Sequence, residues 1–163
     1  MFRRAPWVLM GLLFLGAEMR ANETEDPWIR GIFTGKSPRA VALAETDAWQ
    51  RASSMAERTP DAFVLIGAGR SMQPLYAPGT ILVLQKFPFE LLERGQTVLY
   101  RNHVRKIVAH VLVAPARDGW RAAGLNNPQH DAEPVSPDNL VGVVIAAYQP
   151  LPAPRLALAA LNR

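Results

Sequence analysis

Hydrophobic positions in the first third of the chain have the spacing of a helix. Ser37 and Pro38 supply an N-cap residue and a proline suited to the first helical turn, and Thr59-Pro60 provides a stop. Apolar residues recur every three or four positions between these signals, at Val41, Ala44, Ala48, Ala52, Met55 and Ala56, with Trp49 beside them. We therefore expect one helix over 37–59 that packs on the core. A partner helix for an external groove is the alternative, which the small alanine side chains disfavour.

Beyond Pro60 the pattern changes to short apolar runs separated by turn residues. The runs cover residues 63–66, 81–84, 97–100, 104–113 and 140–146. Reversals fall at Ala77-Pro78-Gly79, Glu93-Arg94-Gly95 and Asp118-Gly119. This pattern predicts a mainly β domain over 61–149, built as a compact antiparallel sheet or a partly closed barrel. Prolines from position 150 onward are expected to end the last strand and leave a proline-rich tail over 150–163.

The first 21 residues have the layout of an export signal. Arg3 and Arg4 precede a largely apolar run over 7–17, and small or polar residues follow. The run is shorter than the roughly 20 residues that a membrane-spanning helix needs, which favours a cleavable signal peptide over a short permanent anchor. A buried helix is disfavoured by the paired arginines at its start. Residues 22–60 would then be a linker followed by the helix, and the protein would be exported, periplasmic or membrane-associated on the extracytoplasmic side.

Composition limits the remaining function classes. The 163 residues are 49% hydrophobic and 20% charged, which suits a single packed domain. Cysteine is absent, so disulfides, thiolate metal sites and a cysteine nucleophile are excluded. The net charge of +4 comes mainly from scattered arginines, without a basic run or a nucleic-acid-reading motif. We expect no nucleic-acid partner, and a membrane surface stays open as an anionic partner.

Ser71 is the first candidate for chemistry. It follows the predicted strand over 63–66 and the small residues Gly67-Ala68-Gly69, which allow the backbone to turn tightly at the rim of a sheet. A serine hydroxyl becomes a nucleophile only when a base removes its proton. From its position alone, an ordinary turn serine is the favoured interpretation of Ser71, because serines are common in loops.

The neighbours of Ser71 make the case more specific. The sequence Ser71-Met72-Gln73-Pro74 resembles the Ser-Met-x-Pro box of the signal-peptidase/LexA-like serine peptidase superfamily. Gly79-Thr80 and Gly95-Gln96 stand where that superfamily usually has Gly-Asp turns, and residues 124–128 and 139–144 are similar to its Gly-Asp-Asn turn and closing strand. The resemblance covers about half the chain, and Leu125 occupies a position that is usually aspartate.

The resemblance implies roles for residues around the serine. Ser71 would be the nucleophile, and its main-chain amide would stabilise the oxyanion. Met72 and Pro74 would shape the wall of the substrate site. The resemblance also implies a base on a strand near the middle of the region, usually lysine and in some membrane-bound members histidine.

Lys106 is the predicted base. Of the three lysines, only Lys106 falls in a mid-domain apolar run, 35 positions after Ser71. Burial beside Ile107 and Val108 would favour the neutral amine that a base requires. A solvent-facing lysine is the alternative. Because Arg105 precedes Lys106, whereas the superfamily has arginine after the lysine, this assignment needs a local shift; arginine itself cannot act as a base.

His110 is the reserve base. It lies four residues after Lys106, on the same face of the predicted strand, and histidine titrates in the appropriate range. A histidine that is merely hydrogen-bonded is the alternative. Asn127 and Asp131, close to the Gly124 turn, are candidates to orient the base. The histidines lack metal-ligand spacing with carboxylates, so we expect no metal and no cofactor.

The sequence thus predicts a signal-peptidase-like serine endopeptidase that cleaves exported polypeptides through a Ser71/Lys106 dyad. The alternative is a catalytically inactive peptidase-like domain that acts as an envelope peptide-binding or assembly module. The missing turn aspartates and the order of Arg105 and Lys106 favour this alternative, and the intact serine box opposes it. A LexA-type repressor is disfavoured because an apolar segment replaces the DNA-reading helices. No pattern indicates an oligomeric state.

Overall fold

The fold is known from a computed structural model, which describes residues 27–152. The predicted export segment over 1–21 and the tail beyond residue 152 lie outside the described residues. In chain order the elements are β1 (Trp28–Ile29), β2 (Ile32–Phe33), β3 (Ala40–Ala44), α1 (Glu45–Arg58), β4 (Ala62–Ile66), β5 (Ile81–Gln85), a short 3-10 helix (Phe89–Leu91), β6 (Thr97–Arg101), β7 (Ile107–Ala116), β8 (Gly119–Ala123) and β9 (Leu140–Leu151). Over the described range, no helix has the length and apolar character needed to cross a membrane.

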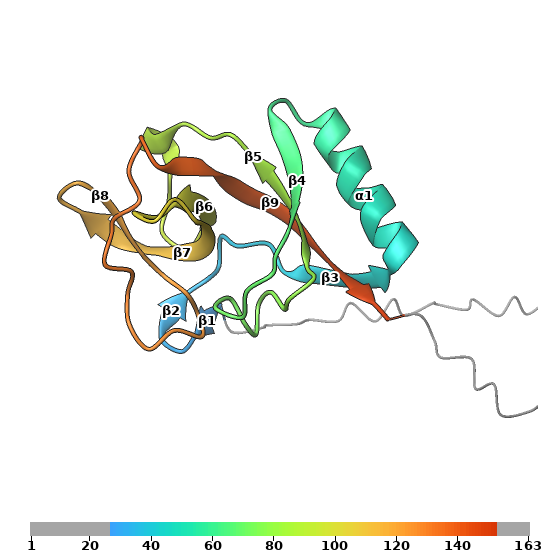
Figure 1. The fold of residues 1–163 in the computed structure, drawn as a ribbon, viewed down its shortest axis with the longest axis horizontal. Coiled ribbons are helices and arrows are strands. Elements are labelled where there is room, and N and C mark those ends of the chain that lie inside the picture. Colours follow the sequence, from blue (N-terminus) through green and yellow to red (C-terminus); the bar gives the residue numbers. More distant parts are fainter. Residues whose placement is uncertain (1–26, 153–163) are drawn as a thin grey trace, which may run out of the picture.

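A seven-stranded sheet organises the molecule. Its strands follow the order β4-β5-β9-β6-β7-β8 with antiparallel neighbours, and β3 pairs in parallel with the far end of β9. The long β9 crosses the middle of the fold, with α1 packed at one end (Figure 1). The predicted mainly β fold with one helix and an antiparallel sheet is confirmed. The sheet is not closed into a barrel, since β4 and β8 remain at opposite ends of the strand order.

The predicted start of the helix at Ser37 was wrong. Residues Ala40–Ala44 form β3, which pairs with residues 147–151 of β9, and the helix begins only at Glu45. The Ser37 hydroxyl bonds the carbonyl of Gly95 at 2.8 Å and the Thr97 hydroxyl at 2.7 Å, so it does not cap a helix. A free edge of β9 thus recruits residues whose helical spacing is visible in the sequence, an override of local pattern by tertiary pairing.

Two predicted strand limits were also wrong. The run over 104–113 becomes a strand only from Ile107, because residues 102–106 form a turn in which the Arg105 N–H donates to the Asn102 carbonyl at 2.7 Å. At the other end of the chain, β9 continues through Pro150 to Leu151. Beyond Tyr148 its partner is β3 alone, so a proline is tolerated at the side of the strand that lacks a neighbour.

The two faces of β5 separate the helix from the serine loop, which is the connection between β4 and β5 that carries Ser71. Ile81 and Val83 are buried with Ala48 and Ala52 of α1. Leu82 and Leu84 point to the other face, where the core also includes Met72, Leu75, Tyr76, Leu99 and Val111. The serine box is therefore anchored on the sheet face opposite the helix.

The loop after β8 returns along the outer edge of that strand. Trp120 and Val135 exchange two backbone hydrogen bonds of 2.8 Å, and the Asp131 N–H donates to the Ala122 carbonyl at 2.9 Å. The crossing is tight at Gly119, whose φ is +141° and where an added Cβ would lie 2.0 Å from the Val135 oxygen. Glycine at this position allows the loop to lie against β8, and the bond from Asp131 to Ala122 holds Asp131 beside that strand.

Replacing Gly119 with alanine is expected to destabilise the fold by about 2–4 kcal/mol, because the methyl group collides with backbone that cannot move without breaking the β8 pairing. Gly31→Ala is the matched control: its φ of +78° is also positive, but an added Cβ meets nothing within 4 Å. That control should cost about 1 kcal/mol. Urea unfolding of both variants measures the difference, and equal costs would contradict the close approach at Gly119.

Candidate active site

Ser71 lies in the connection between β4 and β5, where the chain is fixed on both sides. The Gly67 N–H donates to the Thr80 carbonyl at 2.8 Å, and the Gly79 N–H donates to the Gly67 carbonyl at 2.7 Å. Met72, only 4% exposed, anchors the residue next to the serine in the core. Ser71 itself is half-buried, so its hydroxyl lies at the boundary between the core and solvent.

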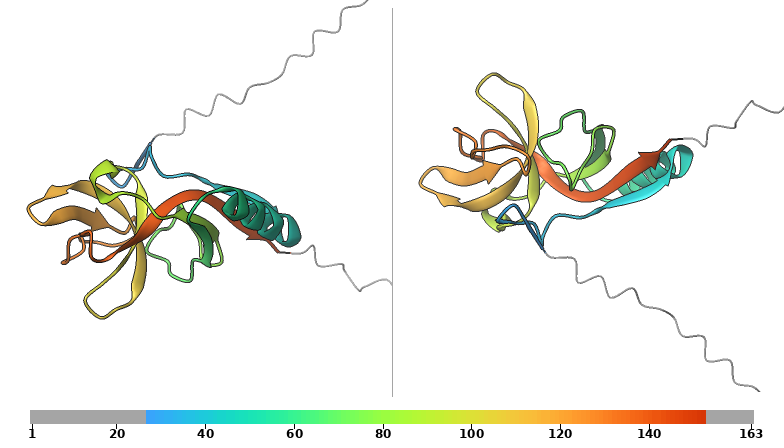
Figure 2. Two further views of the ribbon diagram at one scale, coloured as in Figure 1. Left: turned by 90° about the horizontal axis from the view of Figure 1, so that it is seen from above. Right: turned by 90° about the horizontal axis from the view of Figure 1, so that it is seen from below.

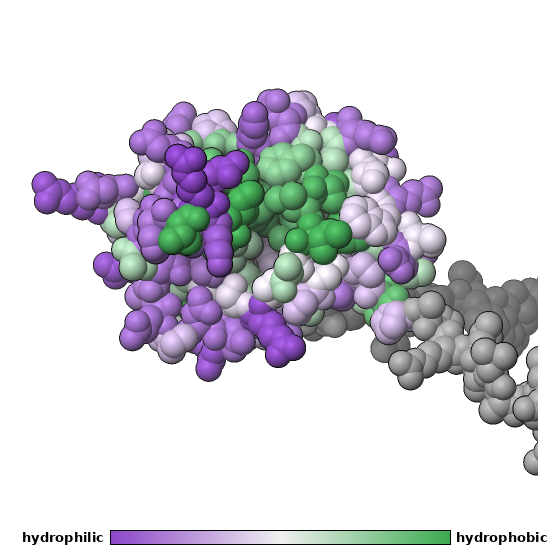
Figure 3. Space-filling view, in the orientation of Figure 1, coloured by the Kyte–Doolittle hydropathy of each residue, from purple (hydrophilic) through white to green (hydrophobic). Residues whose placement is uncertain are grey.

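A cleft of ≈ 360 Å³ opens beside Ser71. One side consists of residues 67–69 with Ser71, and the other side of residues 107–109 at the start of β7. Buried Met72, Leu82 and Leu99 lie beneath it; Leu65, Ile66, Tyr76 and Ala77 complete the lining. Both further views show the β6–β7 hairpin and the β4–β5 connection projecting from the same side of the sheet (Figure 2). Hydrophobic residues gather in the central part of the face seen in Figure 3, with hydrophilic side chains around them.

The cleft has unpaired main chain on both sides. Among the described residues, the N–H groups of Ala68, Gly69 and Ser71 donate no hydrogen bond. Across the cleft, residues 107–110 of β7 pair with β6 only, because the ladder with β8 begins at Val111. Unpaired strand edges of this kind accept an additional extended chain.

His110 belongs to a buried polar cluster next to this cleft. Its Nδ1 lies 2.5 Å from Oδ2 of Asp131, and the Tyr100 hydroxyl donates to the same oxygen at 2.7 Å. The exposed fractions of His110 and Tyr100 are 6% and 2%. Because a carboxylate only accepts hydrogen bonds, this contact places the imidazole hydrogen on Nδ1 and leaves Nε2 as the acceptor of the neutral ring.

One turn, residues 124–127, contacts both Ser71 and His110. The Asn126 N–H donates to the Ser71 carbonyl at 2.7 Å. A Cβ placed on Gly124 would lie 2.9 Å from Nε2 of His110 and 2.8 Å from Nδ2 of Asn127. The acceptor nitrogen of His110 therefore faces the turn that holds the main chain of Ser71. Within the described part of the chain, the Ser71 hydroxyl forms no hydrogen bond.

Lys106 lies elsewhere than the sequence suggested. It is the last residue of the turn between β6 and β7, is exposed, and is not among the residues that line the cleft. Its main-chain N–H is bonded to the Asn102 side chain at 2.9 Å, which closes the turn. The burial expected to desolvate its amine is absent.

The other predicted site residues fall into two groups. Met72 lines the cleft, Asp131 is bonded to His110, and Asn127 lies at the Gly124 turn. Pro74 is exposed and does not line the cleft, so the predicted wall role is not observed for it. Tyr100 was missed, because an aromatic residue in an apolar run reads as core. Its partner became visible only through the strand pairing.

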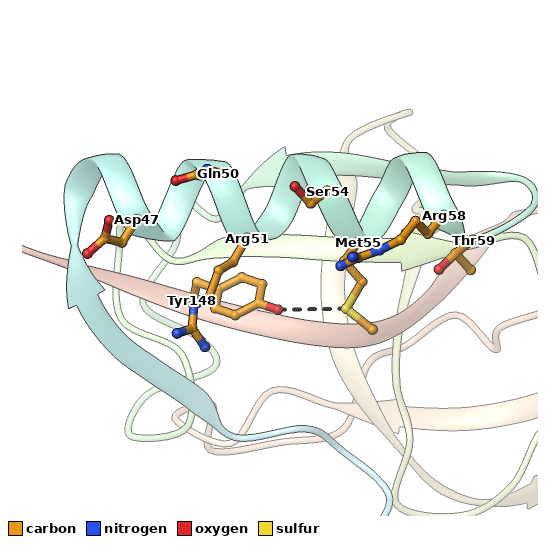
Figure 4. A pocket seen from close by; sticks show the side chains of 8 residues that line it. All are labelled: Asp47, Gln50, Arg51, Ser54, Met55, Arg58, Thr59 and Tyr148. Carbon is orange, nitrogen blue, oxygen red and sulfur yellow. Dashed lines mark hydrogen bonds between the residues drawn. The ribbon is translucent and has the colours of Figure 1, made fainter.

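A larger hollow lies along α1, away from the serine loop. It has a volume of ≈ 800 Å³, is open to solvent, and its lining side chains are shown in Figure 4. The residues are mostly the polar face of the helix above Tyr148 of β9. Over residues 27–152, no three histidine or carboxylate side chains gather to hold a metal ion.

No protein-family model and no curated protein matches this chain. The geometry around Ser71, His110 and Asp131 therefore carries the inference of function.

Burial raises the pKa of Tyr76 and Tyr100 well above the usual 10.0. For Tyr100 the hydrogen bond to Asp131 and the charges of Asp131 and Glu133 act in the same direction. Because the folded pKa lies above the unfolded one, the stabilisation is complete below pH 10 and is lost as the pH rises further.

We therefore expect tyrosinate absorbance of the native protein to lag behind that of the unfolded chain in alkaline titration, and the free energy of unfolding to fall above pH 10. Tyr100→Phe should make this fall shallower, since one coupled ionisation is removed. Ionisation of Tyr100 near pH 10 with native circular dichroism would contradict the buried contact with Asp131.

Proposed function

We propose that this protein is a serine endopeptidase in which Ser71 is the nucleophile, His110 the general base and Asp131 the residue that orients the base. The observation that carries the proposal is the turn over 124–127, which bonds the Ser71 main chain at 2.7 Å and faces Nε2 of His110 across Gly124. A nucleophile, a base and an orienting carboxylate are the three parts that activate a serine.

His110 supports this chemistry better than Lys106. A general base must reach the hydroxyl hydrogen and be unprotonated at working pH. His110 is buried beside the 124–127 turn and bonded to Asp131, whereas Lys106 is exposed on a turn. The base predicted from the sequence is thus replaced by the reserve base.

The reaction would proceed by acyl transfer. Oγ of Ser71 attacks the carbonyl carbon of the substrate while its proton moves to Nε2 of His110. The oxyanion accepts a hydrogen bond from the free N–H of Ser71. The C–N bond then breaks as His110 returns the proton to the leaving amine, and a water activated by His110 hydrolyses the acyl ester. The hydrogen bond between Oγ and Nε2 would close on substrate binding, as catalytic contacts often do.

The cleft favours an extended polypeptide as the substrate. A peptide lying between residues 67–69 and 107–109 would find unpaired main chain on both sides and would add a strand. Apolar side chains of the substrate would enter the cleft over Leu82 and Leu99. The resemblance of the serine box to signal peptidases suggests small side chains beside the scissile bond, and the layout of residues 1–21 suggests exported substrates on the extracytoplasmic side, at or near a membrane surface.

Single substitutions in the full chain test the assignment. Ser71→Ala and His110→Ala are each expected to lower kcat by at least about 10³-fold, because the nucleophile and its base act as one unit. Lys106→Ala, a matched change at an exposed position, should leave kcat within about twofold of wild type. Hydrolysis of signal-like peptides in detergent and labelling of Ser71 by a fluorophosphonate are the measurements. Loss of activity in Lys106→Ala with retention in His110→Ala would restore the lysine dyad.

Gly124→Ala tests the contact between the turn and the base. The three nearest atoms to the added methyl group belong to the side chains of His110 and Asn127, so these side chains, and not a neighbouring strand, have to shift. We expect stability close to wild type but kcat lower by about 10²-fold, since a displacement of about 1 Å at a catalytic group has that effect. Full activity in Gly124→Ala would show that Nε2 is not used.

A peptide-binding module without catalysis is the second candidate. It is favoured by one observation: the Ser71 hydroxyl has no hydrogen-bond partner among the described residues. This candidate predicts that peptides bind in the cleft but are not cleaved, and that fluorophosphonate does not label Ser71. Binding measured by fluorescence anisotropy, alongside the hydrolysis assay, separates the two functions.

A further inference from the structure

We infer that Tyr100 is a positioning residue of this site, whose hydroxyl holds the Asp131 carboxylate in the orientation in which it binds His110. The inference rests on the proposed function, because it assigns Tyr100 a part in the reaction that His110 would catalyse. Tyr100 does not line the cleft, so its effect would pass through Asp131 and His110.

The Asp131 oxygen Oδ2 is shared by two donors. The Tyr100 hydroxyl approaches it to 2.7 Å and Nδ1 of His110 to 2.5 Å. Both donor side chains are almost entirely buried, and the Asp131 side chain is 14% exposed. With little water available, the two protein donors supply the hydrogen bonds that the shared carboxylate oxygen requires.

The two donors are held at a fixed spacing by paired strands. In the β6–β7 ladder, Tyr100 is opposite Val108 and Val98 is opposite His110. Tyr100 and His110 therefore lie two positions apart on one face, and their rings meet edge to face with centroids 6.4 Å apart. Asp131 approaches from the loop after β8, where its own N–H is bonded to the Ala122 carbonyl. Removing the Tyr100 hydroxyl would leave one side-chain donor to hold Oδ2 in place.

Two further titratable groups, Glu133 and His103, lie near this cluster. Glu133, in the loop after β8, acts on Tyr100 electrostatically, and Nδ1 of His103, in the turn between β6 and β7, lies 3.6 Å from Oε2 of Glu133. These groups remain in a Tyr100→Phe variant, so the change tests the hydroxyl contact with Asp131 alone. The aromatic ring, which packs in the core, is also retained.

The experiment compares Tyr100→Phe with Tyr148→Phe in the full chain in detergent. Tyr148 carries the same hydroxyl, but this hydroxyl contacts the Met55 sulfur at 3.7 Å under α1, in the hollow shown in Figure 4. We expect Tyr100→Phe to lower kcat about tenfold with KM unchanged, because the base is less well oriented. Tyr148→Phe should retain wild-type kinetics.

A pH profile separates positioning from a merely structural role. A carboxylate that has lost the Tyr100 donor attracts the imidazole hydrogen more strongly and stabilises protonated His110. The acid limb of kcat/KM should therefore move to higher pH in Tyr100→Phe and stay in place in Tyr148→Phe. A loss of packing alone would lower stability without moving this limb.

A double-mutant cycle tests whether Tyr100 acts through Asp131. In an Asp131→Asn background, adding Tyr100→Phe should reduce kcat no further, since the carboxylate that it positions is gone. An equal loss in both backgrounds would overturn the inference, as would wild-type kcat and pH profile in Tyr100→Phe alone.

Failure of the proposed function has a different signature. Wild-type protein that neither hydrolyses peptides nor reacts with fluorophosphonate at Ser71 would overturn the peptidase itself and the catalytic role of Tyr100 with it. If the wild-type protein is active and Tyr100→Phe has the wild-type kcat and pH profile, only the positioning role of Tyr100 is overturned. The downfield proton resonance expected for Nδ1–H of His110 should shift in Tyr100→Phe, and an unchanged resonance would also count against the contact.

Discussion

The pairing of β9 with strands on both of its edges is the constraint on which the rest of the structure depends. Its twelve residues pair with β5 on one edge and with β6 and then β3 on the other. The serine loop leads into β5, and β7, which carries His110, pairs with β6. Because β5 and β6 both pair with β9, this central strand positions both parts of the site. Leu82 of β5 and Leu99 of β6 lie under the cleft between them. The spacing of these two residues beneath the cleft is therefore set by ladders of backbone hydrogen bonds to β9.

Buried hydrophobic residues next to Ser71 and Asn126 fix the local geometry at the serine. Met72 and Leu125 are 4% and 0% exposed and belong to the same core cluster. Each is adjacent to a residue of the backbone contact between Asn126 and Ser71. Leu125 fixes the turn by its burial in the core. Arg30 of the β1–β2 hairpin reaches the outer side of the same turn, 3.3 Å from Oδ1 of Asn126.

Features that depend on local pattern could be predicted from the sequence, and features that depend on long-range pairing could not. The strands around 63–66, 81–84 and 97–100 are apolar runs between turn residues, and the structure has them within one residue of the predicted limits. Ser71 could be proposed from the sequence because the residues of its motif are contiguous in the chain. β3 was read as helix because its alanines fit both periods, and only the free edge of β9 decides between them. The contact of Tyr100 with Asp131 joins residues 31 positions apart and needs the β6–β7 and β7–β8 ladders to exist first.

Local pattern also favoured Lys106 as the base, and the long-range structure favours His110 as the proposed base in its place. Both were placed on one strand, where residues at even spacing share a face. The turn over 102–106 removes Lys106 from that strand, with Arg105 at a positive φ of 60° that no residue in the sequence signals. His110 remains inside the ladder, opposite Val98, with its acceptor nitrogen toward Gly124. With both Arg105 and Lys106 on an exposed turn, their reversed order carries no information about the base. It ceases to count as evidence for an inactive domain.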